Sequence, residues 1–441
     1  MIAEAKNTPV VRVGIFTRKE FEFTLKGEFR NKRSHQIFHA GSYKVSVSSD
    51  TILINGRYLD EIHLIPQDSE SSFVLHKVTI GVDFHWQRNE DQEFDGELQI
   101  LKVDQQLISI NILPIDDYLN SVISSEMSAT SYMELLKAHT IISRSWLLAQ
   151  IDKNEAIQRD DHKYQSTVQT KDELIKWYDR EDHDHFDVCA DDHCQRYQGV
   201  TRVTTPFVKQ AVEETKGLVL IYQGKICDAR FSKCCGGVTE LFENCWEPVN
   251  HPYLQSFRDA DHSGIEFPDL TIEKKAKEWI LSSPDSFCNT NNASVLKEVL
   301  NTYDQETNQF FRWNITYSQK EISELVHKKT GIDFGIITDF KPLERGASGR
   351  IIRLKIVGAK KVMVIGKELE IRKALSPTHL YSSAFTVEFN EAERRFDFIG
   401  AGWGHGVGLC QIGAAVMGSK GYSFDAILNH YFRGATIEKR Y

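Results

Sequence analysis

Short runs of alternating apolar and polar residues fill the first hundred positions of this 441-residue chain. They are rich in β-branched residues and are separated by Gly, Asn and Asp; the clearest are 10–16, 43–47, 51–56 and 96–103. Period-two alternation between such breakers is typical of strands joined by hairpins. The pattern predicts a β-rich part over residues 1–110.

The spacing of apolar residues changes to a helical period after Pro114. A first helix is predicted to start there, with Asp116 or Asp117 as its cap. The pair Ser131 and Glu134 has the spacing of a capping box for a second helix, which the apolar period carries to about residue 150. A helix pair joined by a turn at 127–130 is therefore expected.

The rest of the chain is mixed. Residues 151–187 are polar and are predicted to be a surface excursion, whereas 265–375 combines an expected helix ending before Thr330 with an expected strand at 350–358. Two helices are predicted to close the chain, the second capped by Ser423. The predicted fold class is α+β, with a β-rich part at 1–110 packed on a mixed α/β core at 111–264 and 376–441, and an inserted α/β lobe at 265–375.

Composition narrows the functional classes. Hydrophobic residues make up 41% of the chain and charged residues 26%, which is enough for a packed core. The 53 basic and 62 acidic residues give a net charge of −9, so no nucleic-acid partner is expected. No run of 18 apolar residues predicts a transmembrane segment, and the first residues do not resemble a signal peptide. The compartment is left open between the cytoplasm and an exported protein whose signal was trimmed.

Residues 402–408 alternate glycine with other residues, and His405 projects from the middle of this run. The spacing does not fit a dinucleotide-binding fingerprint. Alternating glycines allow a backbone to come close to a ligand, although a tight turn with a structural histidine is an equal alternative.

Glu126 is the carboxylate with the clearest chemical potential. Val122 and Leu119 precede it by four and seven residues, so it ends an otherwise apolar helix face. Desolvation there should raise the pKa of Glu126, as a general acid requires. The alternative is a glutamate that lies in solvent at the end of its helix and has no chemical role. Lys137 and Arg144 share a face of the next helix. There they would orient this carboxylate, bind a polar substrate, or form an ordinary basic surface stripe.

The cysteines point to a metal. Six of the eight lie between Cys189 and Cys245, beside several histidines. Cys189 and Cys194, with His183 or His185 and with His193 as a substitute, have a set of donors that suits zinc. Cys234 and Cys235 are candidates for a further ligand. The alternative is a group of reduced structural cysteines.

Five sequence blocks, taken in order, resemble the SpoIID/LytB domain family. They are the helix pair from Leu113 to Met127 and from Glu134 to Ser145, the block 193–199, the block 231–239, the block 345–350 within the insertion, and the block 402–414. With the β-rich opening, the resemblance covers nearly the whole chain. It identifies 111–264 and 376–441 as two halves of a SpoIID-like core.

The resemblance implies action on bacterial cell-wall glycan. In the lytic transglycosylases of this family, the catalytic acid corresponds to Glu126, and a helix Lys and Arg correspond to Lys137 and Arg144. Zinc bound by His and two Cys in some members corresponds to Cys189 and Cys194 with a nearby histidine. The blocks also suggest a set of substrate-binding residues: Gln195, Tyr197, Ser232, Trp403, His405 and Gln411.

Two functions are compatible with these implications. The first is a peptidoglycan lytic transglycosylase that cleaves glycan strands lacking stem peptides, in a cleft where Glu126 and the His405 loop meet. The second is a non-catalytic glycan-binding module that recruits or enhances a cell-wall amidase. The long polar insert, the extra cysteines and the missing export signal depart from the sporulation members. They also leave open a role on recycled wall fragments.

Overall fold

The computed structural model describes residues 8–81, 87–128, 131–159, 166–177, 183–191, 193–202, 205–261, 266–299 and 309–441. These residues form two compact units. The first contains Met1–Gln158, Asp182–Leu220 and Ile437–Tyr441, and the second contains Arg159–Glu181 and Ile221–Thr436. The fold is α+β, as the sequence predicts.

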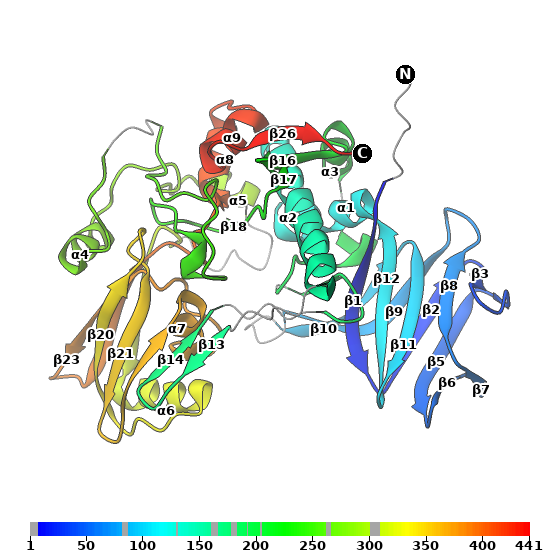
Figure 1. Cartoon of the computed structure of the whole chain (residues 1–441), viewed down its shortest axis with the longest axis horizontal. Coiled ribbons are helices and arrows are strands. Elements are labelled where there is room, and N and C mark those ends of the chain that lie inside the picture. The colour runs from blue at the N-terminus through cyan, green and yellow to red at the C-terminus, as the bar shows by residue number, and fades with distance from the viewer. Residues whose placement is uncertain are drawn as a thin grey trace. The chain divides into compact units, whose positions relative to one another are not determined.

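Two sheets build the first half of unit 1. In strand order, the seven-stranded sheet is β15 (Val188–Cys189), β1 (Val10–Arg18), β12 (Gln106–Pro114), β11 (Glu97–Val103), β8 (Ile62–Pro66), β3 (Phe29–Asn31) and β4 (Ile37–Phe38). The six-stranded sheet is β10 (Arg88–Phe94), β9 (Ser72–Ile80), β2 (Glu20–Lys26), β5 (Gly41–Ser48), β6 (Thr51–Ile54) and β7 (Arg57–Leu59) (Figure 1). Phe21, Phe23 and Leu25 of β2 are buried while their neighbours in the strand are not, as period-two alternation predicts.

The helical part of unit 1 follows β12 without a break. It comprises α1 (Ile115–Glu126), α2 (Met133–Arg159), the 3₁₀ turn η1 (Gly199–Arg202) and α3 (Pro206–Glu214). The N-cap of α1 is Pro114, so Asp116 and Asp117 lie in its first turn and do not cap it. The Ser131 capping box was also a wrong prediction, because α2 begins at Met133 and the buried Ser131 hydroxyl makes no hydrogen bond with the described residues.

One hydrophobic core joins the strands and helices of unit 1. Val11 and Val13 of β1 belong to the same buried cluster as Leu119 and Val122 of α1. The structure therefore groups 1–110 with the helix pair. The border expected at residue 110 does not separate two cores, since β12 runs directly into α1.

Unit 2 contains a five-stranded sheet and a three-stranded sheet around a second core. Their orders are β13 (Thr167–Gln169), β14 (Glu173–Lys176), β22 (Val362–Gly366), β21 (Ile351–Gly358) and β20 (Ile337–Arg345), and β19 (Arg312–Ser318), β24 (Arg395–Ala401) and β23 (Phe385–Asn390). The core includes side chains from Trp313 to Phe398, because β23 and β24 return to pair with β19. It therefore extends beyond the predicted limit of the lobe at residue 375.

The remaining elements of unit 2 are mostly helices and short strands. The helices are α4 (Glu273–Leu281), α5 (Ala293–Val299), α6 (Gln319–Thr330), α7 (Glu368–Ala374), α8 (Gln411–Ser419) and α9 (Phe424–Tyr431), with a 3₁₀ turn, η2 (Phe242–Asn244). The short strands within unit 2 are β17 (Lys225–Ile226), β18 (Phe231–Ser232) and β25 (Leu409–Cys410). The strands β16 (Leu218–Tyr222) and β26 (Thr436–Lys439) contain the points where the chain passes from one unit to the other. The helix α6 ends at Thr330, one residue later than predicted, and Gly331 is its C-cap with a left-handed φ of 70°.

The polar excursion predicted at 151–187 is wrong in part. Helix α2 continues to Arg159, and β13 and β14 then enter the five-stranded sheet, where Glu173 is the register partner of Val364. Within the described residues, no helix has the length and apolar character needed to cross a membrane.

Candidate functional site

Glu126 is the last residue of α1 and is half-buried. The face that leads to it is buried through Tyr118, Leu119 and Val122, as the helical spacing predicts. Its Oε1 accepts a hydrogen bond of 2.9 Å from the backbone N–H of Arg196. The carboxylate is thus positioned against the loop at 193–198 by a neutral donor, which fixes an oxygen without adding a positive charge.

Buried side chains hold this loop against α1. Tyr197 stacks on Tyr118 at a centroid distance of 5.1 Å, and its hydroxyl donates to Asn111 at 2.5 Å. Gln195 lies between the Tyr118 hydroxyl and the carbonyl of Ser143, at 3.3 Å and 3.4 Å. Gln195 and Tyr197 are 1% and 2% exposed, so they position the Arg196 loop in this structure. Their predicted contact with substrate stays a prediction.

Arg144 is buried inside unit 1 and is not part of a basic surface stripe. Its guanidinium is fully buried and donates to the Asp116 carboxylate, to the carbonyls of Thr215 and Leu218, and to the Tyr441 hydroxyl. Any effect of Arg144 on catalysis is therefore indirect, because it ties α2 to the start of α1 and to the segment before β16.

Lys137 has acidic partners on α2 and α3. Its ammonium group lies 2.7 Å from Glu214 and 3.0 Å from Glu134. The hydrogen bond with Glu214 raises the pKa of Lys137, and the contact with Glu134 acts in the same direction. Lys137 and Arg144, expected to act as a pair, therefore contact different acidic residues: Lys137 contacts Glu134 and Glu214, and Arg144 contacts Asp116.

Four ligand atoms for a metal gather at the edge of unit 1. Those of His183, Cys189, His193 and Cys194 all lie within 4.8 Å of one another. The Cys194 Sγ is 3.4 Å from the His183 Nε2 and 3.5 Å from the His193 Nδ1. Ligands on a tetrahedral zinc ion at its usual bond lengths are separated by about 3.5–3.8 Å, so this set fits zinc.

Two residues predicted as possible ligands lie outside this cluster. His185 is not part of it, whereas the alternative His193 is, since His193 and Cys194 are adjacent in the turn that follows Cys189. Cys235 belongs to a different cluster in unit 2 and does not supply a fourth ligand here. Hydrogen bonds with Cys194, His183 and His193 lower the pKa of Cys189 to about 2, although burial opposes this.

The glycine run at 402–408 wraps around an arginine side chain of unit 2. Gly402, Gly404, Gly406 and Gly408 all have φ between 72° and 94°, a region that favours glycine. A Cβ on Gly406 would lie 2.5 Å from the Arg350 guanidinium, which donates to the Gly404 carbonyl at 2.9 Å. The glycines therefore allow the backbone to come close to the Arg350 side chain, whereas the sequence suggested a close approach to a ligand.

Arg350 belongs to a buried polar network that the sequence analysis did not identify. It donates to the Ser348 hydroxyl at 2.9 Å, and that hydroxyl donates to Glu240 at 2.6 Å. Glu240 also accepts the backbone N–H groups of Ala347 and Ser348, both at 3.1 Å. The 345–350 block thus closes around a fully buried carboxylate.

The predicted binding residues of unit 2 lie around this network. His405 accepts the Val407 N–H through its Nδ1 at 3.0 Å, and burial, with the charges of Arg230, Arg372 and Arg350, holds the pKa of its imidazole well below the usual range. Trp403 is half-buried and stacks on Tyr381 at 4.1 Å.

Ser232 and Gln411 are buried. The Ser232 hydroxyl makes no hydrogen bond with the described residues, and Gln411 is the first residue of α8. Glu126 belongs to unit 1 and His405 to unit 2, so their common cleft stays a prediction.

The fold and site define an α+β protein with a carboxylate at a helix end, fixed by a loop that also carries two ligands of a Cys₂His₂ cluster. Residues 103–222, which include both features, match the family model described as Stage II sporulation protein, SpoIID. Residues 240–408 match the model of a domain of unknown function, DUF8618.

Relatives agree with this match. The chain is 24% identical over 337 residues to the stage II sporulation protein D of Bacillus amyloliquefaciens, covering 75% of this chain and 76% of the relative. It is 26% identical over 345 residues to an uncharacterized protein of Brachyspira hyodysenteriae, covering 78% and 72%. It is also 26% identical over 242 residues to the amidase enhancer of Bacillus subtilis, covering 52% and 32%. Residues 103–222 thus match a SpoIID domain, and the relatives support the SpoIID/LytB assignment that the motifs predict.

Proposed function

We propose that this chain is a peptidoglycan lytic transglycosylase that acts on glycan strands without stem peptides. The position of Glu126 carries the proposal: a half-buried carboxylate at the end of an apolar helix face, oriented by the Arg196 N–H at 2.9 Å. A single oriented acid is what the reaction requires.

Glu126 acts first as an acid and then as a base. It donates its proton to the glycosidic oxygen as the bond to the anomeric carbon breaks, and the leaving sugar departs with a new hydroxyl. The carboxylate then takes the proton of the 6-hydroxyl group on the sugar that contains the anomeric carbon. The oxygen of that hydroxyl bonds to the anomeric carbon and closes the 1,6-anhydro ring. No water is consumed, so the second carboxylate with which ordinary inverting glycosidases activate water is not needed.

The Cys₂His₂ cluster has a structural part in this proposal. His183, Cys189, His193 and Cys194 would hold zinc, which supplies rigidity to the loop that contains them. Arg196 is two residues after Cys194, and its N–H is the donor to Glu126. A metal-bound Cys194 would therefore hold the Arg196 N–H in place, and this N–H orients the Glu126 carboxylate.

The second candidate is a glycan-binding module that enhances a cell-wall amidase. The relative named amidase enhancer supports it, and the Trp403–Tyr381 stack in unit 2 offers an aromatic surface of the kind that packs on sugars. A module of this kind has no use for a proton donor at Glu126, so the two candidates differ at this residue.

The test is incubation of the full chain with glycan strands stripped of peptides, followed by mass spectrometry. The transglycosylase predicts products that are lighter by one water than the hydrolysis products of the same strands. In parallel, a cell-wall amidase is assayed on intact peptidoglycan with and without the chain. Stimulated amidase without anhydro-ended products would support the second candidate.

A further inference from the structure

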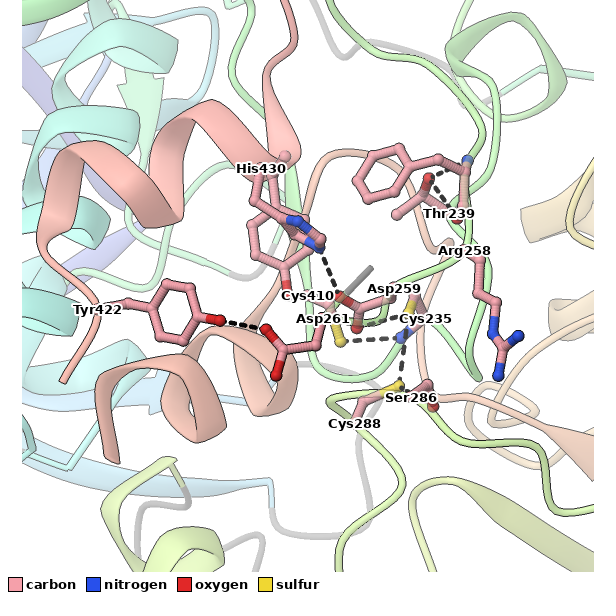
Figure 2. Close-up of polar contacts among 12 residues, drawn as sticks. Cys235, Thr239, Arg258, Asp259, Asp261, Ser286, Cys288, Cys410, Tyr422 and His430 are labelled. Atoms are coloured by element: carbon pink, nitrogen blue, oxygen red, sulfur yellow. Dashed lines mark hydrogen bonds and ion pairs between the residues drawn. The ribbon is translucent and has the colours of Figure 1, made fainter. Parts of the chain in front are cut away.

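A second thiol cluster lies in the interior of unit 2, beside the Arg350 network, where the Cys235 carbonyl accepts a hydrogen bond from Arg350 at 3.2 Å. Cys235, Cys288 and Cys410 converge with Asp259, and their four ligand atoms all lie within 4.8 Å of one another (Figure 2). The four side chains are between 0% and 3% exposed. Three sulfur atoms and a carboxylate in one buried volume need a chemical explanation, because burying a charged group is costly unless it is paired or coordinates a metal.

Backbone contacts bring the four residues together from distant parts of the chain. Cys410 ends β25, which pairs in parallel with β18, and the Cys235 N–H donates to the Cys410 Sγ at 3.2 Å. The N–H of Asp259 donates to the Gly237 carbonyl, and the Asp259 carbonyl accepts from Phe287, next to Cys288. The geometry therefore comes from main-chain hydrogen bonds and does not depend on surface side chains.

The distances suit one metal ion. The Cys235 Sγ lies 3.5 Å from the Cys288 Sγ and 3.3 Å from the Asp259 Oδ2. Around tetrahedral zinc, two thiolates are separated by about 3.8 Å, and a thiolate and a carboxylate oxygen by about 3.6 Å. Small adjustments would bring the ligands to these separations.

The carboxylate is oriented as a metal ligand would be. The Asp259 Oδ1 is held by the His430 Nε2 at 3.1 Å and by the Tyr431 hydroxyl at 2.9 Å, so the Oδ2 faces the thiols (Figure 2). Partners of this kind fix the direction of ligating side chains in metal sites. A disulfide would join only two of the sulfurs and would leave the third and the carboxylate without a role.

We propose that Cys235, Asp259, Cys288 and Cys410 form a second, structural metal site that binds a zinc-class ion. The ion would cross-link the segment after β18, the loops around 259 and 288, and the junction between β25 and α8. It would thereby fix the C-terminal end of the glycine run through Cys410, which lies two residues after Gly408. This site is independent of the catalytic proposal.

Metal analysis of the full chain, purified without chelator from zinc-containing medium, tests the proposal. We expect two zinc ions in the wild type, one in Cys288→Ser, one in Cys194→Ser and none in the double variant. The control Cys227→Ser, a buried cysteine outside both described clusters, should retain two. One zinc ion retained in Cys194→Ser would support the second site, because this variant lacks a ligand of the first cluster.

X-ray absorption keeps the test independent of the folding of Cys288→Ser. In the Cys189→Ser/Cys194→Ser background, the remaining zinc should have three sulfur ligands at about 2.3 Å and one oxygen at about 2.0–2.2 Å. The Cys234 thiol adjoins Cys288 and Cys410 but is not one of the four proposed ligands, so a Cys234→Ser variant of this background should leave the spectrum unchanged. A background protein without metal, or with a Cys235–Cys288 disulfide in its peptide map, would overturn the proposal, as would zinc unchanged by Cys288→Ser.

Discussion

Replacing Arg144 with methionine tests whether this residue supports the fold or contacts the substrate. Its guanidinium has no exposed surface. It donates hydrogen bonds to the Asp116 carboxylate, the Tyr441 hydroxyl and the carbonyls of Thr215 and Leu218. Methionine fills much of the volume but leaves the Asp116 carboxylate, only 15% exposed, without its cation, and leaves two carbonyls without this donor. Breaking a buried pair in this way costs about 3–5 kcal/mol, so the free energy of unfolding should fall by that amount.

Urea unfolding followed by circular dichroism measures the effect. The control Arg57→Met, on the exposed strand β7, should change stability by less than about 0.5 kcal/mol. The double variant Arg144→Met/Asp116→Leu removes both charges and should be more stable than Arg144→Met alone. A loss below about 1 kcal/mol in Arg144→Met, with a large loss of glycan binding, would refute the structural role.

Two further predictions follow from the titratable groups. Burial, aided by nearby Arg372, lowers the pKa of His379 to about 3 from 6.5, so only the unfolded state binds this proton between those values. The free energy of unfolding should then decrease by about 1.4 kcal/mol per pH unit below pH 6.5. Urea titrations at pH 7 and pH 5 measure this decrease, and His379→Gln should remove the contribution of His379 to it. The same decrease in His379→Gln as in the wild type would contradict the lowered pKa of His379. In the Cys₂His₂ cluster, His193→Ala should reduce the zinc content by half or more and should also reduce glycan cleavage. The control His185→Ala should alter neither quantity, as metal analysis and a product assay would show. Equal losses in the two variants would indicate that His185 is also a ligand.

Local patterns predicted the strands and helices whose burial is periodic. The alternation in β6 and the apolar spacing in α1 depend only on residues close together in the sequence, so the sequence alone reveals them. Strands β13 and β14 escaped prediction because they are only three and four residues long, and because β14 pairs with β22, about 190 residues further along. Pairing of that kind is decided by tertiary contacts.

The site shows the same division. Glu126 was identifiable because the apolar face that precedes it lies on the same helix. The burial of Arg144 and Arg350 was not, since an arginine is usually exposed and its acceptors here are distant in sequence. Spacing allowed either His185 or His193 as a ligand, and only the turn after Cys189 selects His193. Cys288 and Cys410 are isolated in the sequence and meet Cys235 only in the fold.

Turnover of peptide-free glycan strands by Glu126→Gln tests the central claim most directly. Glutamine retains the size of the side chain and an oxygen that can accept the Arg196 N–H, but it has no proton to transfer. Cleavage should fall by about two to four orders of magnitude with glycan binding largely retained, and Glu213→Gln, on the exposed face of α3, should cleave like the wild type. Full cleavage by Glu126→Gln would contradict the mechanism, and a wild type that binds glycan without producing anhydro ends would contradict the enzyme itself.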